Sequence, residues 1–291
     1  MSTELAIANE RGQSMAELMG VSSAPSQEYT PSISRLGLQQ MQPIMGEVEL
    51  NGKMIKTEVV PIGAFKLTTG DETVYSETAT IRVFAQRKQL QRWNSETEEM
   101  EKSVMANTTN VDLKDSTGGL NLGRPAGFIE DFDSLPEETK QHIRLIKLVT
   151  VFYGTVTFDN PINEKGEPVG AVESVPFVMD VKNRDSLKSI NGVLSVLKKK
   201  NMLPIMSTIK LEGITGSVAS GAKFGKISAS LGDAVDLISS DNDMLKDFLE
   251  LIEYSNGKIL DLHHERAKGG TDGDEELVEG ILNNDFVEVD E

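Results

Sequence analysis

Hydrophobic and polar positions in the middle of the chain alternate with the two-residue period of β-strands. In VYSETATIRVFAQRKQ, the apolar residues Ala79, Ile81, Val83 and Ala85 occupy every second position. The positions between them hold Thr80, Arg82, Phe84 and Gln86. Because successive strand residues point to opposite faces of a sheet, this segment predicts a strand with one apolar face. The other face is predicted to carry Arg82 and Phe84 side by side.

Turn signals divide the surrounding sequence into further short strands. Asn51-Gly52 stands between two alternating runs, which is the strongest short signal for a β-hairpin, and TTGDET marks a second turn. Later strands are predicted for VTVFYGTVTF, AVESVPFVMDV, PIMSTIKLEGITG and AKFGKISAS. Many short strands with frequent turn signals favour a barrel or a sandwich with helical insertions.

Three helices are predicted among these strands. In NRDSLKSINGVLSVLKKKN, apolar residues recur three or four apart between Leu187 and Leu197, which is helical spacing. In DSLPEETKQHIRLIKL, Ser134 and Glu137 form a capping-box pattern at the start of a second helix. A final helix, DNDMLKDFLELIEYSNGK, is expected to end at Asn256-Gly257, because such a pair commonly terminates helices.

These elements divide the chain into three parts. Residues 1–40 are polar and without a periodic pattern, and they are predicted to be an arm or linker. Residues 41–265 hold the predicted strands and helices and form the core, and residues 266–291 form an acidic C-terminal tail. The fold class is predicted as mostly β with helical insertions (α+β).

The composition limits the possible chemistry. The 291 residues include no Cys and three His, and no HExxH-type spacing occurs. Thiolate metal sites and a Cys nucleophile are therefore excluded, and a zinc enzyme is disfavoured. The run GSVASGAKFGK departs from a phosphate-binding P-loop, because Lys226 precedes Ile227 instead of Ser or Thr. We expect no cofactor, no metal and no catalysis.

Membrane and secretion signals are missing from the sequence as it stands. No stretch approaches the ~18–20 apolar residues of a membrane span, and the N-terminus contains early acids and no apolar run of signal length. Together with the lack of Cys, this predicts a soluble protein of a reducing compartment, the cytoplasm, with no membrane partner.

The formal net charge is −17, from 46 acids and 29 bases. The last 21 residues hold nine acids and no base, so residues 1–270 still carry 37 acids against 29 bases. Positive charge is nevertheless concentrated in three windows. Val181–Ser230 holds nine bases and two acids, IRVFAQRKQLQRW holds four bases and no acid, and Lys140, Arg144 and Lys147 have the spacing of one helix face. Such segregation is what an electrostatic groove for a polyanion requires.

Aromatic residues fall in or beside the basic windows, and a ring on a basic strand face can stack a nucleobase for about 1–3 kcal/mol. A place in the core is the alternative for each strand aromatic, and a solvated helix end is the alternative for the lysines at 198–200. The candidate nucleic-acid-binding residues are Arg82, Phe84, Arg87, Lys88, Arg92, Trp93, Arg124, Lys140, Arg144, Lys147, Tyr153, Lys198, Lys199, Lys200, Lys210, Lys223, Phe224 and Lys226.

The chain ends in EELVEGILNNDFVEVDE, which is acidic and contains one aromatic residue. By itself, such a segment is typical of a solvating end. Tethered to a cationic groove, it also competes for that groove at high effective concentration, and it offers an acidic-hydrophobic peptide to partner proteins. The candidate partner-binding residues are Asp285, Phe286, Glu288, Asp290 and Glu291.

This layout resembles the single-stranded DNA-binding proteins of bacteriophages and bacteria. The resemblance is carried by TIRVFAQRKQLQRW as a binding strand and loop, by STIKLEGITGSVASGAKFGKISAS as a late hairpin and by NNDFVEVDE as the tail. The run GRPAGFIEDFDSLPEETKQHIRLIKLVTVFYGTVTF also resembles phage replication-type proteins. The resemblance implies an OB-fold-like barrel over residues 41–265 and, for a phage-encoded chain, the host cytoplasm.

For function, the resemblance implies binding of single-stranded DNA without strong sequence preference during phage DNA replication and recombination. Lys and Arg would neutralise phosphates while bases stack on aromatic rings, and the tail would recruit replication proteins such as a polymerase or a helicase. Self-association stays open, with the arm at residues 1–40 as one route.

Three other functions stay open as well. A phage virion or tail structural protein fits the many short strands, the lack of Cys and the acidic balance. An accessory replication protein, such as a helicase loader or a recombination mediator, would bind another protein more tightly than DNA. An enzyme is the remaining alternative. Salt-dependent binding of oligonucleotides separates the DNA-binding protein from the virion protein, which would instead self-assemble through its sheet surfaces.

Overall fold

The fold is described from a computed structural model of the chain. It describes residues 33–40, 42–50, 53–218 and 220–269. The chain divides into two units, residues 1–32 and 33–291, and every described residue belongs to the second.

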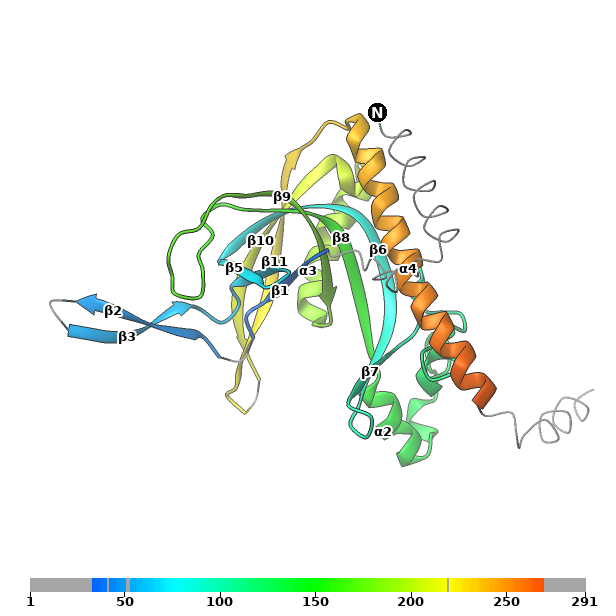
Figure 1. The fold of residues 1–291 in the computed structure, drawn as a ribbon. Coiled ribbons are helices and arrows are strands. Elements are labelled where there is room, and N and C mark those ends of the chain that lie inside the picture. The colour runs from blue at the N-terminus through cyan, green and yellow to red at the C-terminus, as the bar shows by residue number, and fades with distance from the viewer. Residues whose placement is uncertain (1–32, 41, 51–52, 219, 270–291) are drawn as a thin grey trace, which may run out of the picture. The chain divides into compact units, whose positions relative to one another are not determined.

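Eleven strands and three α-helices are found in the described residues (Figure 1). The strands are β1 (Ser34–Leu38), β2 (Ile44–Leu50), β3 (Lys53–Val60), β4 (Phe65–Thr69), β5 (Glu72–Ser76), β6 (Thr78–Asn94), β7 (Glu99–Lys102), β8 (Lys147–Phe158), β9 (Val172–Val181), β10 (Ser207–Ser217) and β11 (Lys223–Ala234). The α-helices are α2 (Glu137–Leu145), α3 (Arg184–Lys199) and α4 (Ser239–Gly269). Short 3₁₀ helices cover Asn121–Gly123, Phe132–Ser134 and Pro204–Met206.

Nine of the strands form one mixed sheet in the order β11-β10-β6-β8-β9-β1-β4-β5, with β7 paired to β6. The pairing of β1 with β9 is parallel, and the other pairings in this sheet are antiparallel. β2 and β3 form a separate two-stranded sheet, which extends away from the larger one (Figure 1). The predicted fold class, mostly β with helical insertions (α+β), is confirmed at this level.

The predicted hairpin and the predicted second turn are both confirmed by the strand register. In the first, Leu50 lies opposite Lys53, so Asn51-Gly52 connects β2 to β3, although these two residues themselves lie outside the described part of the chain. In the second, Thr69 lies opposite Glu72 across the turn between β4 and β5. Local turn chemistry alone was sufficient to predict both connections.

The main hydrophobic core lies between one face of the large sheet and α3. Phe152, Phe177 and Ile81 come from the sheet, while Ile190 and Val193 of α3 are buried against them. Burying a side chain of this size contributes roughly 1.5–3 kcal/mol. The apolar spacing predicted this helix. It begins at Asn183, whose side chain accepts a hydrogen bond from the Ser186 amide.

A second cluster lies on the opposite face of the sheet, beneath α4, which runs beside β6 (Figure 1). We call this surface the α4 face. The register of β6 against β8 shifts between Val83 and Ala85, which marks a β-bulge at Phe84. Because a bulge adds one residue and changes the alternation, Ala85 joins the cluster beneath α4 instead of the main core. The predicted apolar face is therefore correct only for Ala79, Ile81 and Val83.

Two predicted boundaries are wrong. Residues 1–40 are not arm throughout, because Ser34–Leu38 form β1 between β9 and β4, and Leu36 is buried in the main core. The last helix does not end at Asn256-Gly257 but continues to Gly269, past the predicted tail boundary at residue 266. The reason is tertiary. The side chain of Asn256 accepts a hydrogen bond from the amide of Met105 (2.7 Å) and donates one to its carbonyl (3.0 Å).

The predicted capping box is also missing. Pro136 occupies the N-cap of α2 without a side-chain cap, and the Ser134 hydroxyl donates instead to the Asp131 carbonyl. The helix itself forms, but it ends at Leu145. Lys147 therefore belongs to β8 and does not share a helix face with Lys140 and Arg144 as predicted.

The Asn256 contact generates a stability prediction. We expect Asn256→Ala to lower the free energy of unfolding by about 1–3 kcal/mol, because it leaves an amide and a carbonyl of Met105 without partners beneath α4. Urea unfolding followed by circular dichroism measures this. Asn242→Ala, at an exposed position of the same helix, is the control and should change the value by less than about 0.5 kcal/mol. Equal effects of the two substitutions would contradict the role given to Asn256.

Candidate nucleic-acid interface

Strand pairing brings charged side chains from distant parts of the chain onto the α4 face. Val151 lies opposite Arg87 on one side and opposite Asp180 on the other, and Arg35 lies opposite Val178. Because directly opposite residues share a face, and Val151 and Val178 belong to the cluster beneath α4, these charged residues lie on the α4 face. Arg35 and Asp180 are exposed to solvent.

Asp180 and several cations act on two neighbouring groups of this surface, Lys102 and Tyr153. Burial lowers the pKa of Lys102 below its usual value, the charges of Arg35 and Lys182 lower it further, and Asp180 acts in the opposite direction. Burial raises the pKa of Tyr153 to about 12, Asp180 adds to this, and Arg35 and Arg87 oppose it. We call Arg35, Arg87, Lys102 and Lys182, which share this surface with Asp180, the basic cluster.

Buried glutamines hold Asp180 in place. The side chain of Gln91 donates to the Asp180 carboxylate at 3.3 Å and to the side-chain oxygen of Gln89 at 2.9 Å, and Gln89 donates to the Ser103 carbonyl at 2.8 Å. Both glutamines are buried. The carboxylate is therefore fixed among the cations by an amide chain that runs along β6.

An exposed indole continues the same surface. Trp93 lies opposite Met100, two residues along β6 from the pair formed by Gln91 and Lys102. Since residues two apart on a strand share a face, the ring of Trp93 follows the basic cluster along β6, and its residue is 55% exposed. Lys147 lies opposite Gln91 from the other side and is exposed as well. The surface thus joins an accessible ring to several cations.

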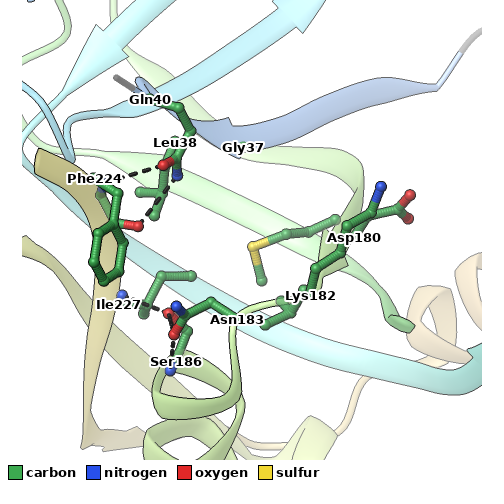
Figure 2. A pocket seen from close by; sticks show the side chains of 12 residues that line it. Gly37, Leu38, Gln40, Asp180, Lys182, Asn183, Ser186, Phe224 and Ile227 are labelled. Atoms are coloured by element: carbon green, nitrogen blue, oxygen red, sulfur yellow. Dashed lines mark hydrogen bonds between the residues drawn. The ribbon is translucent and has the colours of Figure 1, made fainter. Parts of the chain in front are cut away.

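A pocket of about 350 Å³ opens next to the cluster (Figure 2). The parallel pairing of β1 with β9 covers two residue pairs, Ser34 with Phe177 and Arg35 with Val178. Beyond these pairs the pocket lies between β1, the end of β9, the start of α3 and β11. It is lined by Gly37, Leu38, Gln40, Met179, Asp180, Val181, Lys182, Asn183, Ser186, Phe224, Gly225 and Ile227. Asp180 and Lys182 belong both to this pocket and to the surroundings of the basic cluster.

Arg82, Phe84 and Tyr153 have structural roles, which corrects the sequence interpretation of all three. Arg82 forms a two-point ion pair with Asp241 (2.7 and 2.8 Å), and its guanidinium lies 5.3 Å from the centre of the Phe84 ring. Phe84 packs edge-on against Phe248 of α4 at 5.5 Å, and Tyr153 is 4% exposed. These side chains are occupied because α4 covers this part of the strand, which the polar residues beside them did not indicate.

The candidates around α2 are held in local contacts. Arg92 donates to Glu101 at 2.6 Å and contacts His142, and Arg124 donates to the Gly127 carbonyl at 3.1 Å. The remaining pairs are local. Lys140 and Arg144 pair with Glu137, and Lys147 donates to the Arg144 carbonyl. Exposed pairs of this kind contribute only about 0–1 kcal/mol, so the exposed Arg144 and Lys147 remain accessible.

The Gly-rich run around Arg124 is a structural loop. The carboxylate of Asp115, which is fully buried, accepts hydrogen bonds from the amides of Thr117, Gly119 and Leu122. His263 of α4 bonds to the carbonyl of Asp115. The loop therefore anchors the end of α4.

The late lysines are not gathered at one site. Lys198, Lys199 and Lys200 are exposed at the end of α3. Lys210 and Lys226 have carboxylates nearby, at 3.7 Å (Asp233) and 4.0 Å (Asp185). Lys223 is exposed beside Phe224, which lines the pocket, and Lys88 lies on β6 paired with Ala106.

Sequence reasoning placed only Arg87, Trp93 and Lys147 on the surface of the basic cluster, and Phe224 at the adjoining pocket. It missed Arg35, Lys102 and Asp180 as site residues, and it counted Lys182 only as part of a charged window. Arg35 was assigned to the arm, and Lys102 stands next to an acid in the sequence. No local signal distinguishes them, because only the pairing of β1, β6, β7 and β9 brings them together. The tail residues Asp285, Phe286, Glu288, Asp290 and Glu291 lie outside the described residues.

Comparison of the chain with protein-family models, with curated proteins and with solved structures finds no match. Within the described ranges, no three or more His, Cys, Asp or Glu side chains are arranged to hold a metal ion. Among the helices of the described part, none is both long and apolar enough to cross a membrane.

The ion pair between Arg82 and Asp241 predicts a pH dependence of stability. The hydrogen bond from Arg82 lowers the pKa of Asp241 below its usual value of 3.8. A depressed carboxyl pKa stabilises the folded state above the unfolded pKa, and this contribution is lost as the pH falls through the folded pKa.

We therefore expect Asp241→Asn to destabilise the protein by about 3 kcal/mol at pH 7, because Arg82 loses its buried partner. The difference from the unmodified protein should stay constant down to about pH 4 and narrow below it. Urea unfolding at several pH values measures this. Asp243→Asn, at an exposed position two residues away, is the control. A difference that persists undiminished at the lowest pH would refute the assignment.

Proposed function

We propose that the protein binds single-stranded DNA without strong sequence preference, through the basic cluster and Trp93. The observation that carries the proposal is the gathering of four cations, drawn from β1, β6, β7 and the end of β9, beside an exposed indole on one surface. Cations along a surface follow the phosphates of a strand, while a ring stacks any base. Neither contact reads base identity, so the binding is general.

The electrostatic cost of the cluster favours a polyanion as its ligand. Like charges repel, and desolvation of Lys102 makes its charge still more costly. The chain as a whole has a net charge of −17, but within the cluster the carboxylate of Asp180 offsets only part of the positive charge. Phosphates supply the missing negative charge, and binding them releases counterions, which gives a salt-dependent affinity.

An OB-like barrel is the finer fold that goes with this function, and we propose it for the curved part of the large sheet. Contacts between the two ends of the strand order support it. The Gln40 side chain bonds to both the amide and the carbonyl of Gly225 on β11. A Cβ at Gly213 would overlap the Gly63 carbonyl, so the β3–β4 turn lies directly on β10. A partly open barrel of this kind is a common platform for single strands.

The role proposed for the protein is in phage DNA replication and recombination, where it covers exposed single strands. The acidic tail recruits replication proteins such as a polymerase or a helicase, and it competes with DNA for the basic cluster. The opposite charges of the tail and the cluster support this competition, because a tethered polyanion acts at high effective concentration.

A phage virion or tail structural protein is the second candidate, and one observation favours it. The β2–β3 hairpin exposes Met45, Met54 and Ile55 to solvent and belongs to no larger sheet among the described strands. Apolar side chains on a projecting hairpin suit assembly with other copies. This candidate calls for self-assembly without salt-dependent binding of oligonucleotides.

The DNA-binding proposal is tested by titrating the protein with oligo-dT at several salt concentrations while the emission of Trp93, the only Trp, is recorded. We expect quenching that weakens as salt rises. Lys182→Ala should weaken binding and reduce the slope of log K against log salt by about 0.7, the value for one phosphate contact to a single strand. Lys165→Ala, at an exposed loop position away from the cluster, should leave the slope unchanged. Absence of binding at low salt, confirmed by gel shift, would rule out the function.

The tail competition is tested by removing residues 271–291. We expect tighter binding of oligo-dT at low salt and a smaller gain at high salt, because screening weakens the attraction between tail and cluster. A full-length variant with its nine tail acids replaced by Asn and Gln should bind as tightly as the truncated protein. Unchanged affinity in both variants would leave the tail with a solvating role.

Phe286→Ala, with DNA affinity as its control, tests recruitment of partner proteins.

A further inference from the structure

We infer that the pocket between β1, β9, α3 and β11 takes one unstacked nucleobase of the bound strand. The inference rests on the proposed function and assigns a specific contact to it. The basic cluster and Trp93 provide sites for phosphates and for one stacked base. They give no role to the open pocket beside the cations.

The pocket exists because two neighbouring strands separate. β1 leaves β9 after the pair Arg35–Val178 and stays paired with β4, while β9 continues to Val181 and leads into α3. Phe224 and Lys182 stand on opposite sides of the resulting pocket (Figure 2). Its volume of about 350 Å³ lies at the lower end of the range for small-ligand pockets, about 300–1,000 Å³.

The walls suit a flat aromatic group. The lining side chains of Leu38, Val181 and Ile227 are apolar, Phe224 supplies a ring, and Met179 supplies a polarisable thioether. A thioether and a phenyl ring both make favourable contacts with an aromatic face. A nucleobase is flat, aromatic and of suitable size, and a single strand exposes it at low cost because no base pair has to be broken.

The polar groups of the wall are largely engaged within the protein. The Gln40 side chain bonds to Gly225, the Ser186 hydroxyl accepts from the Ile227 amide at 2.9 Å, and the Asn183 side-chain oxygen accepts from Ser186. The pocket therefore presents little hydrogen-bonding pattern with which to select a base. We expect it to accept bases of different identity, as general binding of single strands requires.

The charge at the rim identifies the rest of the ligand. Lys182 lines the pocket and also belongs to the basic cluster, and Lys226 shares a strand face with Phe224. Lys182 has no ion-pair partner within the part of the chain that the structure describes. A base in the pocket thus remains linked to phosphates that lie on Lys182 and continue across the cluster.

Gly37 allows the pocket to be filled without disturbing the fold. A Cβ at Gly37 would meet nothing within 4 Å, and its backbone lies outside the left-handed region that favours glycine. Because Gly37 also lines the pocket, Gly37→Leu adds an apolar side chain at its wall and narrows it. Gly170→Leu is the matched control, because Gly170 is an exposed loop residue that likewise has open space around its Cβ position.

The test measures binding of both variants and the unmodified full-length chain to two strands of equal length, oligo-dT and an abasic oligodeoxyribose phosphate. Both strands carry the same phosphates. We expect Gly37→Leu to weaken binding of oligo-dT on the order of tenfold, the effect of losing one stacked base, and to leave binding of the abasic strand unchanged. Gly170→Leu should change neither affinity, and urea unfolding should show that both variants are folded.

Two results would overturn the inference. Equal affinity of Gly37→Leu and the unmodified protein for oligo-dT would mean that the pocket holds no base. Equal weakening toward both strands would mean that the leucine only obstructs the path of the backbone. In either case, salt-dependent binding by the unmodified protein would leave the proposed function standing, whereas no binding of either strand by any of the proteins would remove the function itself.

Discussion

The pairing of β6 with β8 is the constraint on which the rest of the structure depends. These strands of 17 and 12 residues lie at the centre of the strand order, and their hydrogen bonds run from the Thr80–Thr157 pair to the Gln91–Lys147 pair. Since each residue pair assigns its side chains to one face, this register decides which residues pack beneath α4 and which form the core with α3. The bulge at Phe84 shifts that assignment midway, so one strand contributes to both clusters.

The same register gives the α4 face two kinds of chemistry. Toward the start of β6, α4 covers the surface with Phe248 and Ile252, and Arg82 is paired with Asp241. Toward its end, the surface carries Arg87, Lys102 across from Gln91, and the exposed Trp93. A covering helix thus stabilises one half, while the other half carries the cations beside Asp180, which the buried glutamines hold in place. The pocket adjoins the basic cluster and forms where β1 separates from β9.

The positive charge of the basic cluster contrasts with the net negative charge of the whole chain. The chain carries a net charge of −17, and its acids are densest at the C-terminal end. Bringing cations together in such a chain costs electrostatic energy. Each cation is repelled by its new neighbours and lies farther from carboxylates that would attract it. That the strand order nevertheless brings four of them onto one surface with Asp180 is the main reason for assigning the surface a polyanionic ligand.

The sequence by itself determined the local features: the Asn51-Gly52 hairpin, the α3 helix with its apolar spacing, the long alternating strand and the acidic end. These follow from turn chemistry and periodicity, which act over a few residues. Only the tertiary structure decided that Arg82 and Phe84 are structural, that Ser34–Leu38 is an internal strand, that α4 passes Asn256-Gly257 and that Arg35 and Lys102 share a surface. The physical reason is that these outcomes depend on strand pairing and helix cover between residues far apart in the chain, and such contacts outweigh local preference wherever the two conflict.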